Sequence, residues 1–588
     1  MPPFLPRLPL FIALGLIAAH CAIAAPVRDL MSDTWVATDA IGRTLAGNKD
    51  CGAPKANKTV GIFYFLWLEK KPAGIYDISK MLAENPANPK YGPRHAFHHW
   101  GEPHLGYYAM DDEWVIRKHA QMLTDAGVDV VIFDVTNALI YEDVYLAICR
   151  VYDQIRRTGR ATPRIAFIAH SSEEKTIAKL YDKFYSKNLH PDLWFSWKGK
   201  PLLLAKPDGM TPQIKSFFSI RESWAWTKGQ KWFGDGRDKW PWLDHYPQNF
   251  GWTDSPAKPE QITVCVAQHP VSNIGRSFHD GKEPPPGQTE PFKGLCFAEQ
   301  WKRALEVSPE FVFITGWNEW VAQRFLKEPK GGAGHMLGVK LKEGDSFFVD
   351  QYNQEFSRDV EPMRGGHTDL YYYQMVDNIR RYKGARPLPR PSAPKTIPIT
   401  DRFAPWQDVG PDYLDDLEDT AHRNHPSFGG KLTYVNNSGR NDFDLMKVAR
   451  DQDNLYFYVR TRDPITPPLT STNWMWLLLN TDGNPRNGWE GYDFIVNRTV
   501  KNPGTTVLER NAGGWKWSPV AEVKLIVKGN ELHLAIPRAA LAVGPEKGPL
   551  RVDFKWADNV PESGNAVDFM DQGDVAPNNR FNYRFEER

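Results

Sequence analysis

Apolar runs alternate with amphipathic stretches along residues 60–384. Continuous apolar and β-branched runs, such as residues 128–137, are typical of parallel strands covered on both faces. Residues 111–127 instead place apolar positions three and four residues apart, which predicts a helix that ends before Gly127. The predicted strands are residues 60–68, 128–137, 164–170, 200–206, 222–227, 261–268 and 311–317, and the predicted helices are residues 111–127, 142–159, 173–187, 297–310 and 368–384.

This repeated strand–helix order predicts an α/β fold, a (β/α)8 TIM barrel, over residues 26–384. An open, doubly wound sheet is the alternative. No glycine-rich phosphate loop follows the first predicted strand, and this counts against a dinucleotide-binding domain.

The pattern changes near residue 385. Residues 385–400 are rich in proline and predict a semi-rigid linker. Beyond it, short strand-like segments are separated by Asn, Asp and Gly turns, which predicts an all-β sandwich over residues 401–588. These segments are residues 431–437, 443–451, 454–463, 473–483, 491–500, 505–511, 517–530, 531–539 and 551–558.

The first 25 residues have the pattern of a secretory signal peptide. Arg7 precedes an apolar core, residues 8–19, and Ala22-Ile23-Ala24 forms a cleavage signature. This predicts export to the periplasm or the extracellular space. A lipid anchor at Cys21 is the disfavoured alternative, because His20 fits that motif poorly. No other segment is long and apolar enough to predict a membrane span.

Composition narrows the choice of partners. The chain has 72 Lys and Arg against 71 Asp and Glu, which argues against a nucleic-acid partner. The cysteines beyond the signal are Cys51, Cys149, Cys265 and Cys296. They are scattered without zinc-binding spacing, so we expect buried free thiols and no metal at the active site. The oligomeric state has no sequence signal.

Polar residues collect where predicted strands end, the edge that forms the active-site face of a β/α barrel. Glu319 follows the strand at residues 311–317 and stands between Trp317 and Trp320. Indoles on both sides should desolvate this carboxyl and raise its pKa, which suits proton transfer. The alternative is a structural Glu319 paired with an arginine. The other polar strand-end residues are Asp134, Asn137, His170, Gln268, His269 and Asn318.

The segment "ITGWNEW" resembles the WNEW signature of glycoside hydrolase families 99 and 71. The segments "GIFYFLW", "AGVDVVIFDVTN" and "GKPLLLAK" are similar to those families in order and spacing. The resemblance implies a barrel glycosidase with a carbohydrate substrate and no cofactor needed for catalysis. It also implies that Glu319 assists the substrate 2-hydroxyl as nucleophile, through an anhydro-sugar intermediate, while a Glu three residues later is the acid/base.

The chain departs from the family pattern at that second position, where Ala322 stands. The later segment "DQYNQEFSRDVEPM" resembles the family's E-G-T-x-x-E-P with one extra residue, if residues 321–348 loop out and return. We therefore expect Glu319 and Glu355 to be the catalytic pair, with Asp359 as the reserve for the second role. Ala322 also supports the alternative of a non-catalytic glycan-binding protein. A third candidate is an enzyme that transfers sugars onto cell-surface glycans. A nucleotide-sugar donor would need basic residues for its phosphates near the strand ends, and the sequence shows none there.

Other side chains near the strand ends are expected to bind substrate, either at sugar hydroxyls or through stacking of aromatic rings. For His170 and His269 a purely structural role is the alternative. The predicted substrate-binding residues are Tyr64, Trp67, Asp134, Asn137, His170, His269, Trp317, Asn318 and Trp320.

The C-terminal segments "DLMKVARDQDNLYFYVRTRD" and "WMWLLLNTDGNPRNGWEGYDFIVNR" resemble carbohydrate-binding module family 9. The resemblance implies aromatic faces that clamp a sugar. Trp474 and Trp476 share one face of a strand and suit either the core or a sugar platform, whereas Trp489 is expected to be more exposed. The acidic turn at residues 480–488 is a candidate for a structural calcium. A purely structural accessory domain is the alternative.

Overall fold

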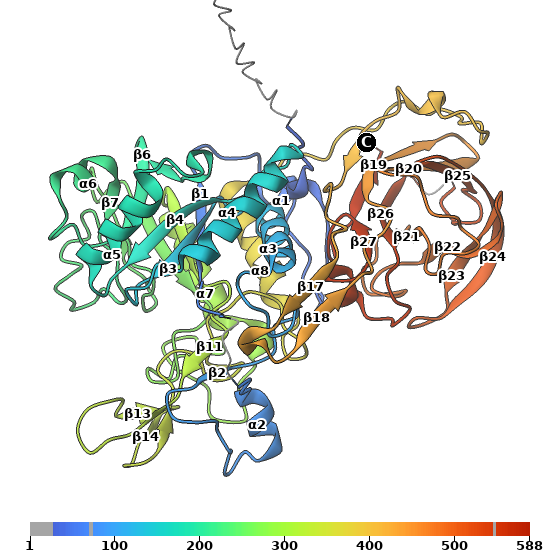
Figure 1. Cartoon of the computed structure of the whole chain (residues 1–588). Helices are drawn as coiled ribbons and strands as arrows, with labels where there is room; N and C mark the ends of the chain where they lie inside the picture. The colour runs from blue at the N-terminus through green and yellow to red at the C-terminus, as the bar shows by residue number, and fades with distance from the viewer. Residues whose placement is uncertain (1–26, 70–73, 545–547, 588) are drawn as a thin grey trace, which may run out of the picture.

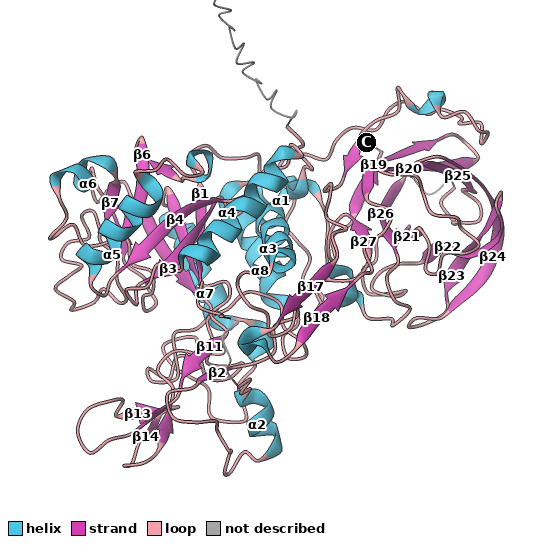
Figure 2. Cartoon of the chain, viewed as in Figure 1, coloured by secondary structure: helices cyan, strands magenta, loops and turns pink. Residues whose placement is uncertain are grey.

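The computed structural model describes residues 27–69, 74–544 and 548–587. The chain forms two parts (Figure 1), and helices gather around the first of them (Figure 2). The predicted signal peptide at residues 1–25, with Cys21, lies outside the described residues. In the described ranges, no helix combines the length and apolar character needed to cross a membrane.

The first part is built on a curled parallel sheet in the order β7-β6-β4-β3-β1-β10-β9, with short antiparallel strands at β5 and β8. The predicted α/β fold with a parallel sheet is thus confirmed. The strands are β1 (Thr59–Tyr64), β3 (Val130–Val135), β4 (Arg164–Ala169), β5 (Ser196–Trp197), β6 (Lys200–Leu204), β7 (Ser219–Arg221), β8 (Phe250–Gly251), β9 (Gln261–Cys265) and β10 (Phe311–Thr315).

An irregular segment, residues 239–243, lies between β7 and β9. Parallel bridges join Glu222 to Lys239 and Ala225 to Leu243. On the other side, Gln261 Nε2 donates to the Pro241 carbonyl at 2.8 Å and Thr263 Oγ1 to that of Trp242 at 2.8 Å. The predicted strand at residues 222–227 is thus only bridged, and residues 222–260, all described, hold no helix. Here the fold departs from the regular strand–helix repeat.

Helices cover the outer face of the sheet and aromatic side chains fill its inner face. Helix α3 begins where Asp112 Oδ1 accepts the amide of Trp114 at 3.1 Å, and it ends at Gly127 with a φ of 84°. On the inner face Phe311 packs against Trp240, with ring centroids 4.5 Å apart. The helices are α1 (Asn48–Cys51), α2 (Ile78–Glu84), α3 (Glu113–Ala126), α4 (Glu142–Arg157), α5 (Glu173–Leu180), α6 (Pro212–Phe217), α7 (Leu295–Val307) and α8 (Leu370–Lys383).

Glu260, at the amino end of β9, forms a buried ion pair inside the curled sheet with Arg221, the last residue of β7. We call the end of the sheet around Glu260 the floor. Indole nitrogens of Trp197 and Trp240 also donate to Glu260, at 2.9 and 2.8 Å. Arg221, Trp197 and Trp240 all donate hydrogen bonds to the Glu260 carboxylate, so its negative charge is neutralised within the core.

A small excursion of strand pairs follows β10 and extends away from the sheet (Figure 1). It occupies the segment predicted to loop out. Its pairs are β2 (Phe97–His99) with β11 (Val321–Gln323), β12 (Phe325–Leu326) with β15 (Ser346–Phe347), and β13 (His335–Met336) with β14 (Val339–Lys340).

The second part is all-β, as predicted. Its strands form one continuous curled antiparallel sheet of eleven strands, in place of the two packed sheets of the predicted sandwich. The strands are β16 (Tyr413–Leu414), β19 (Phe443–Arg450), β20 (Asn454–Thr461), β21 (Trp476–Asn480), β22 (Phe494–Asn502), β23 (Thr505–Asn511), β24 (Trp517–Lys528), β25 (Glu531–Pro537), β26 (Arg551–Asp558), β27 (Asp574–Ala576) and β28 (Tyr583–Glu586).

The sheet is curled so far that its two ends meet. The Tyr413 hydroxyl on β16 donates to the Arg584 carbonyl on β28 at 3.1 Å, and the Tyr583 hydroxyl donates to the Leu414 carbonyl at 2.8 Å. Residues 385–400 contain no helix or strand. Their Ile397 is buried in an apolar cluster against this sheet.

A hairpin of the second part, β17 (Arg423–Pro426) with β18 (Thr433–Asn436), reaches the first part (Figure 1). Arg423 Nε donates to Asp112 Oδ2 at 2.8 Å, the same carboxylate that caps α3. The Phe428 amide donates to the Tyr107 carbonyl at 2.7 Å. The two parts are therefore joined by buried polar contacts as well as by the chain.

The four cysteines within the described residues are free thiols, as predicted. Cys149, Cys265 and Cys296 are buried and Cys51 is half-buried. Burial raises the pKa of the Cys149 thiol above its ordinary value.

Candidate active site

The W-N-E-W segment follows β10 and is fixed against the end of β1. The Asn318 side chain accepts the Phe65 amide at 2.9 Å and donates to the Phe65 carbonyl at 3.2 Å. On the other side, Asp359 Oδ1 accepts the backbone amide of Glu319. Because the Asn318 side chain bonds to the backbone of Phe65, its role here is to position the W-N-E-W segment.

The excursion after β11 returns to this segment. The Gly316 amide donates to the Arg358 carbonyl at 2.7 Å, and the amide of Val360 donates back to the Gly316 carbonyl at 3.1 Å. Residues 358–361 thus run beside residues 316–317. This return brings new side chains to Glu319.

The Glu319 carboxylate is held through one oxygen. Its Oε2 accepts Gln351 Nε2 at 2.6 Å, Arg358 Nε at 3.0 Å and Arg358 Nη2. No hydrogen bond to Oε1 is found within the described residues, although the side chain is only 4% exposed. Burial raises the pKa of Glu319 well above its ordinary value, Arg358 opposes the rise, and the charges of Asp350 and Asp359 add to it.

Asp350 is the most open carboxylate of this group, with 40% of its side chain exposed. Its Oδ1 lies 3.5 Å from Arg358 Nη2. Its charge contributes to the raised pKa of both Glu319 and Asp134, and opposes the lowering of the pKa of His269. Asp350 therefore lies near all three. Neither Asp350 nor Arg358 was predicted, because both come from the irregular return segment.

Asp134 ends β3 and stands in the same neighbourhood. Its Oδ1 accepts the Thr136 amide at 3.0 Å. Burial raises the pKa of Asp134 to about 6, Thr136 and the indole of Trp67 oppose the rise, and the charge of Asp350 adds to it. The structure thus brings the predicted residues Asp134 and Trp67 to the carboxylates around Glu319.

Partly exposed aromatic rings extend this group along the strand ends. The Arg358 guanidinium lies over the ring of Trp242, 5.7 Å from its centroid. Trp242 in turn lies 6.0 Å from Trp224, which stacks on the predicted residue His170 with ring centroids 3.4 Å apart. Flat, partly exposed rings beside carboxylates suit the apolar faces of sugar rings. Trp224 and Trp242 were missed because residues 222–243 have no regular periodicity.

Two predicted residues, Tyr64 and Trp320, lie in a buried network instead. The Tyr64 hydroxyl hydrogen-bonds His119 Nδ1 at 2.8 Å, on the helix-covered face of the sheet. His119 Nε2 and the hydroxyl of Tyr108 meet the carboxylate of Glu361 at 2.9 and 2.6 Å, and the Trp320 indole donates to it as well. These contacts hold Trp320, and with it the W-N-E-W segment, from the helix-covered side of the sheet.

The two indoles that flank Glu319 in sequence are both fully buried. Trp317 packs against His119 with centroids 5.5 Å apart, and Trp320 stacks on Trp100 at 4.4 Å. The expected desolvation of Glu319 is present, but these rings face other aromatic side chains.

Within the described residues, neither Asn137 nor His269, both predicted, is hydrogen-bonded to Glu319. Asn137 is exposed, and its amide donates to the Tyr141 hydroxyl at 2.5 Å. His269 is partly buried, with Nδ1 accepting the Ser272 amide at 3.1 Å. Burial lowers the pKa of His269 to about 4, with Arg358 adding to the effect. A neutral imidazole is therefore present at neutral pH.

Of the predicted second carboxylates, Glu355 is bonded away from Glu319, whereas the reserve candidate Asp359 is buried next to it. Glu355 accepts the Ser277 amide at 2.6 Å and the Ser277 hydroxyl at 2.8 Å. It lies beside Glu283, whose pKa burial raises to about 8, with the charge of Glu355 adding to the rise. No contact between Glu355 and Glu319 is found within the described ranges. Asp359 is fully buried, accepts the Trp100 indole at 2.8 Å, and has its pKa raised by burial to about 7.

The C-terminal candidates are all buried. Trp474 and Trp476 are 2% and 1% exposed, and Trp489 is buried too at 6%, so it is the most exposed of the three only by a small margin. Trp489 donates to the Gly564 carbonyl at 3.1 Å and packs on Trp515 with centroids 4.4 Å apart. A sugar platform at these residues is not supported.

The acidic turn at residues 480–488 is occupied by its own donors. Asp482 Oδ1 accepts the Asn484 amide at 2.8 Å, and its Oδ2 accepts the Asn487 side chain at 2.5 Å. The Asn480 side chain accepts the Gly483 amide at 2.8 Å. These bonds are those of a capped hairpin turn.

No protein-family model matches the chain, and no curated protein matches it by sequence. Among solved structures the chain is similar to an endo-alpha-mannosidase of glycoside hydrolase family 99 from Bacteroides thetaiotaomicron, at 16% identity and a TM-score of 0.31, over 55% of this chain and 98% of that one. The same enzyme with bound bis-tris-propane is 15% identical, with a TM-score of 0.31, over 55% of this chain and 97% of that one. A glycoside hydrolase-like protein gives 11% identity and a TM-score of 0.30, over 57% and 96%.

At these TM-scores the similarity carries no conclusion about substrate or catalytic residues. The two enzyme structures belong to one of the families that the W-N-E-W segment resembles. The functional case rests on the side chains around Glu319.

Proposed function

We propose that this protein is an exported glycoside hydrolase that cleaves a poly- or oligosaccharide at the carboxyl ends of the parallel strands. One observation carries the proposal. The Glu319 carboxylate is held through Oε2 alone, by Arg358 and Gln351, beside an open carboxylate and partly exposed indoles. Glycoside hydrolysis uses a carboxylate that can act on the substrate, and this one keeps an oxygen without a donor beside surfaces that suit sugar rings.

Glu319 is proposed as the base that assists the attacking hydroxyl. Arg358 and Gln351 fix its orientation, and its raised pKa makes it a stronger base than an ordinary glutamate. The attacking hydroxyl belongs either to water or, as the family resemblance implies, to the substrate.

A second carboxyl must protonate the leaving oxygen. Glu355 is the candidate that the sequence motif implies. The geometry favours Asp350 over Glu355, because Asp350 pairs with the Arg358 that holds Glu319, whereas Glu355 bonds to Ser277. Asp350 also keeps much of its side chain open to solvent and thus to a substrate.

The test is product release from a panel of α- and β-linked glycans. Wild type is compared with Glu319→Gln, Asp350→Asn and Glu355→Gln, and with Glu328→Gln as a surface control on the excursion. Cleavage of one glycan by wild type and the control, lost in Glu319→Gln and Asp350→Asn, supports the proposal. Loss in Glu355→Gln with full activity in Asp350→Asn supports the motif-based pair instead.

Non-catalytic glycan binding is the second candidate function. It is favoured by Ala322, which stands where the family has its acid/base and is paired with His98 between β11 and β2. Binding of a glycan without cleavage, unchanged in Glu319→Gln, would support this function and contradict hydrolysis.

The export proposal rests on the signal-like pattern of residues 1–25. Expression in a bacterial host followed by mass spectrometry of the periplasmic or secreted protein tests it. A chain lacking residues 1–25 is the expected product, whereas a full-length cytosolic chain or a lipid on Cys21 would contradict it.

A further inference from the structure

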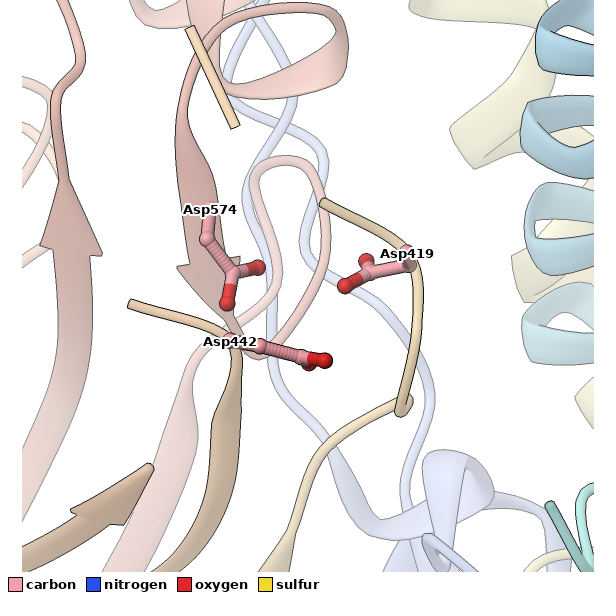
Figure 3. A group of neighbouring side chains, drawn as sticks. All are labelled: Asp419, Asp442 and Asp574. Carbon is pink, nitrogen blue, oxygen red and sulfur yellow. The ribbon is translucent and has the colours of Figure 1, made fainter. Parts of the chain in front are cut away.

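Three aspartates from separate segments meet inside the second part of the molecule (Figure 3). Asp419 lies in the loop between β16 and β17, Asp442 directly precedes β19, and Asp574 opens β27. One carboxylate oxygen of each lies within 4.8 Å of the others. All three side chains are at least nine-tenths buried.

The protein supplies too few donors for these carboxylates. Asp419 Oδ2 accepts Gln121 Nε2 at 2.8 Å, and Asp442 Oδ2 accepts the Glu418 amide at 2.9 Å. The Oδ1 atoms of both aspartates are buried and find no hydrogen-bond partner among the described residues. Figure 3 shows the Asp419 and Asp442 carboxylates pointing toward each other. Two unpartnered, buried oxygens therefore face one shared space.

Charge is unbalanced as well. The ion-pair partners of the group are Lys118, 4.0 Å from Asp419, and Arg462, 3.7 Å from Asp442, and the buried Lys555 interacts electrostatically with Asp574. Asp415 adds a fourth, fully buried carboxylate close by, and neither of its oxygens has a hydrogen-bond partner in the described part of the chain. Buried carboxylates are normally paired or bound to a metal, because leaving them unpaired costs several kcal/mol.

We propose that Asp419, Asp442 and Asp574 bind a calcium ion. The donors are all carboxylate oxygens, which a hard cation prefers, and no histidine or thiol is part of the group. Ca²⁺–oxygen distances of about 2.3–2.6 Å place ligands on opposite sides of the ion roughly 5 Å apart, so the observed spacing fits. Magnesium, with oxygens at about 2.0–2.1 Å, would need these side chains to close in.

The proposed ion would join four elements. Its ligands come from the β16–β17 loop, the start of β19 and β27, and Asp419 is hydrogen-bonded to Gln121 on α3 of the first part. The site is distinct from the predicted acidic turn at residues 480–488, whose aspartate is already bonded within the turn.

The experiment uses the full chain stripped with EDTA and freed of chelator. Isothermal titration with CaCl2, and separately with MgCl2, measures binding, and thermal unfolding measures its effect on stability. The variants are Asp442→Asn and Asp574→Asn, with Asp482→Asn as the matched control in the acidic turn.

Wild type and Asp482→Asn should bind one Ca²⁺ per chain, more tightly than Mg²⁺, and unfold several degrees higher with it. Asp442→Asn should bind at least tenfold more weakly. In EDTA it should unfold at or above the wild-type temperature, because one repelling charge is gone. If a variant does not fold, the wild-type titration still decides the matter. No Ca²⁺ binding by wild type, wild-type affinity in Asp442→Asn, or loss of binding in Asp482→Asn overturns the proposal.

Discussion

Two buried glutamate–arginine pairs in the described residues of the parallel part differ in how the glutamate is bonded. At the floor, both oxygens of Glu260 receive donors: Arg221 donates to each at 2.7 Å, and Trp197, Trp240 and Thr253 add three more bonds. Burial alone would raise the pKa of Glu260, but Arg221 and the indoles lower it to about 2.

At the opposite end, Glu319 receives donors on one oxygen only, and its pKa is raised. An arginine partner therefore does not by itself assign a structural role, which was the alternative left open by the sequence. A carboxylate whose two oxygens both accept hydrogen bonds is stabilised in its ionised form. One that keeps a free oxygen beside open surface can still accept a proton.

The largest expected effect follows from exchanging each carboxylate for an amide. Glu319→Gln should lower kcat/KM on the cleaved glycan by about 10³-fold or more while the unfolding temperature changes little, because Arg358 keeps Asp350 as a charge partner. Glu260→Gln should lower the unfolding temperature and leave kcat/KM of the folded protein nearly unchanged, since it leaves Arg221 buried without its charge partner. Steady-state kinetics and thermal unfolding of both variants measure this. An active Glu319→Gln, or an inactive but stable Glu260→Gln, would remove the distinction between the two ends.

Removing the arginine tests how each glutamate depends on its partner. Arg358→Met should destabilise the fold by about 3–5 kcal/mol, because it leaves Glu319 buried with fewer donors. Adding Glu319→Gln should restore most of that stability, since the uncompensated charge is gone. Urea unfolding of the single and double variants gives the coupling. Equal losses in the single and double variants would show that the two side chains act independently.

The pH dependence of stability comes next in size. The pKa of Asp134 is about 6 in the fold against an ordinary 3.8. The folded chain therefore keeps a proton that the unfolded chain has lost, and this group's contribution to stability falls as pH rises from about 4 to 6. Asp134→Asn should stabilise the protein by about 1–3 kcal/mol at pH 7 and by nothing at pH 3. Urea unfolding at both pH values checks the sign, with Asp482→Asn as control.

The smallest effect separates the aromatic residues of the two ends. Trp242→Ala should raise KM about three- to tenfold with little change in kcat, which corresponds to a stacking contribution of about 1 kcal/mol. Trp240→Phe at the floor should leave KM unchanged and cost about 1 kcal/mol of stability, because one donor to Glu260 is lost. A wild-type KM in Trp242→Ala would argue against sugar stacking there.

Regular elements were predictable because their periodicity reflects which face is buried. The helix predicted at residues 111–127 is observed at Glu113–Ala126, and the strand predicted at 551–558 is observed at Arg551–Asp558. Residues 239–243 were not predictable, since they are held by side chains of Gln261 and Thr263 that reach their carbonyls. No local pattern encodes such contacts.

The site divides in the same way. A carboxylate at the end of β10 was predictable because the strand pattern stops there. Its partners Gln351, Arg358 and Asp350 come from an irregular segment that returns after a long excursion. Trp489 was expected to be more exposed than Trp474 and Trp476, and the margin is small for a related reason: distant residues such as Gly564 cover this turn residue.

The cap of α3 has a consequence for how the molecule comes apart. Asp112 starts this helix with one oxygen and accepts Arg423 of the hairpin with the other. Further along, Gln121 holds Asp419, and Asp125 pairs with Arg160, which also pairs with Asp416. A single helix of the parallel part thus makes polar contacts to several segments of the second part. The proline-rich segment links the two parts along the chain, but the contacts of α3 also connect them. Unfolding of either part therefore removes hydrogen-bond and ion-pair partners from the other.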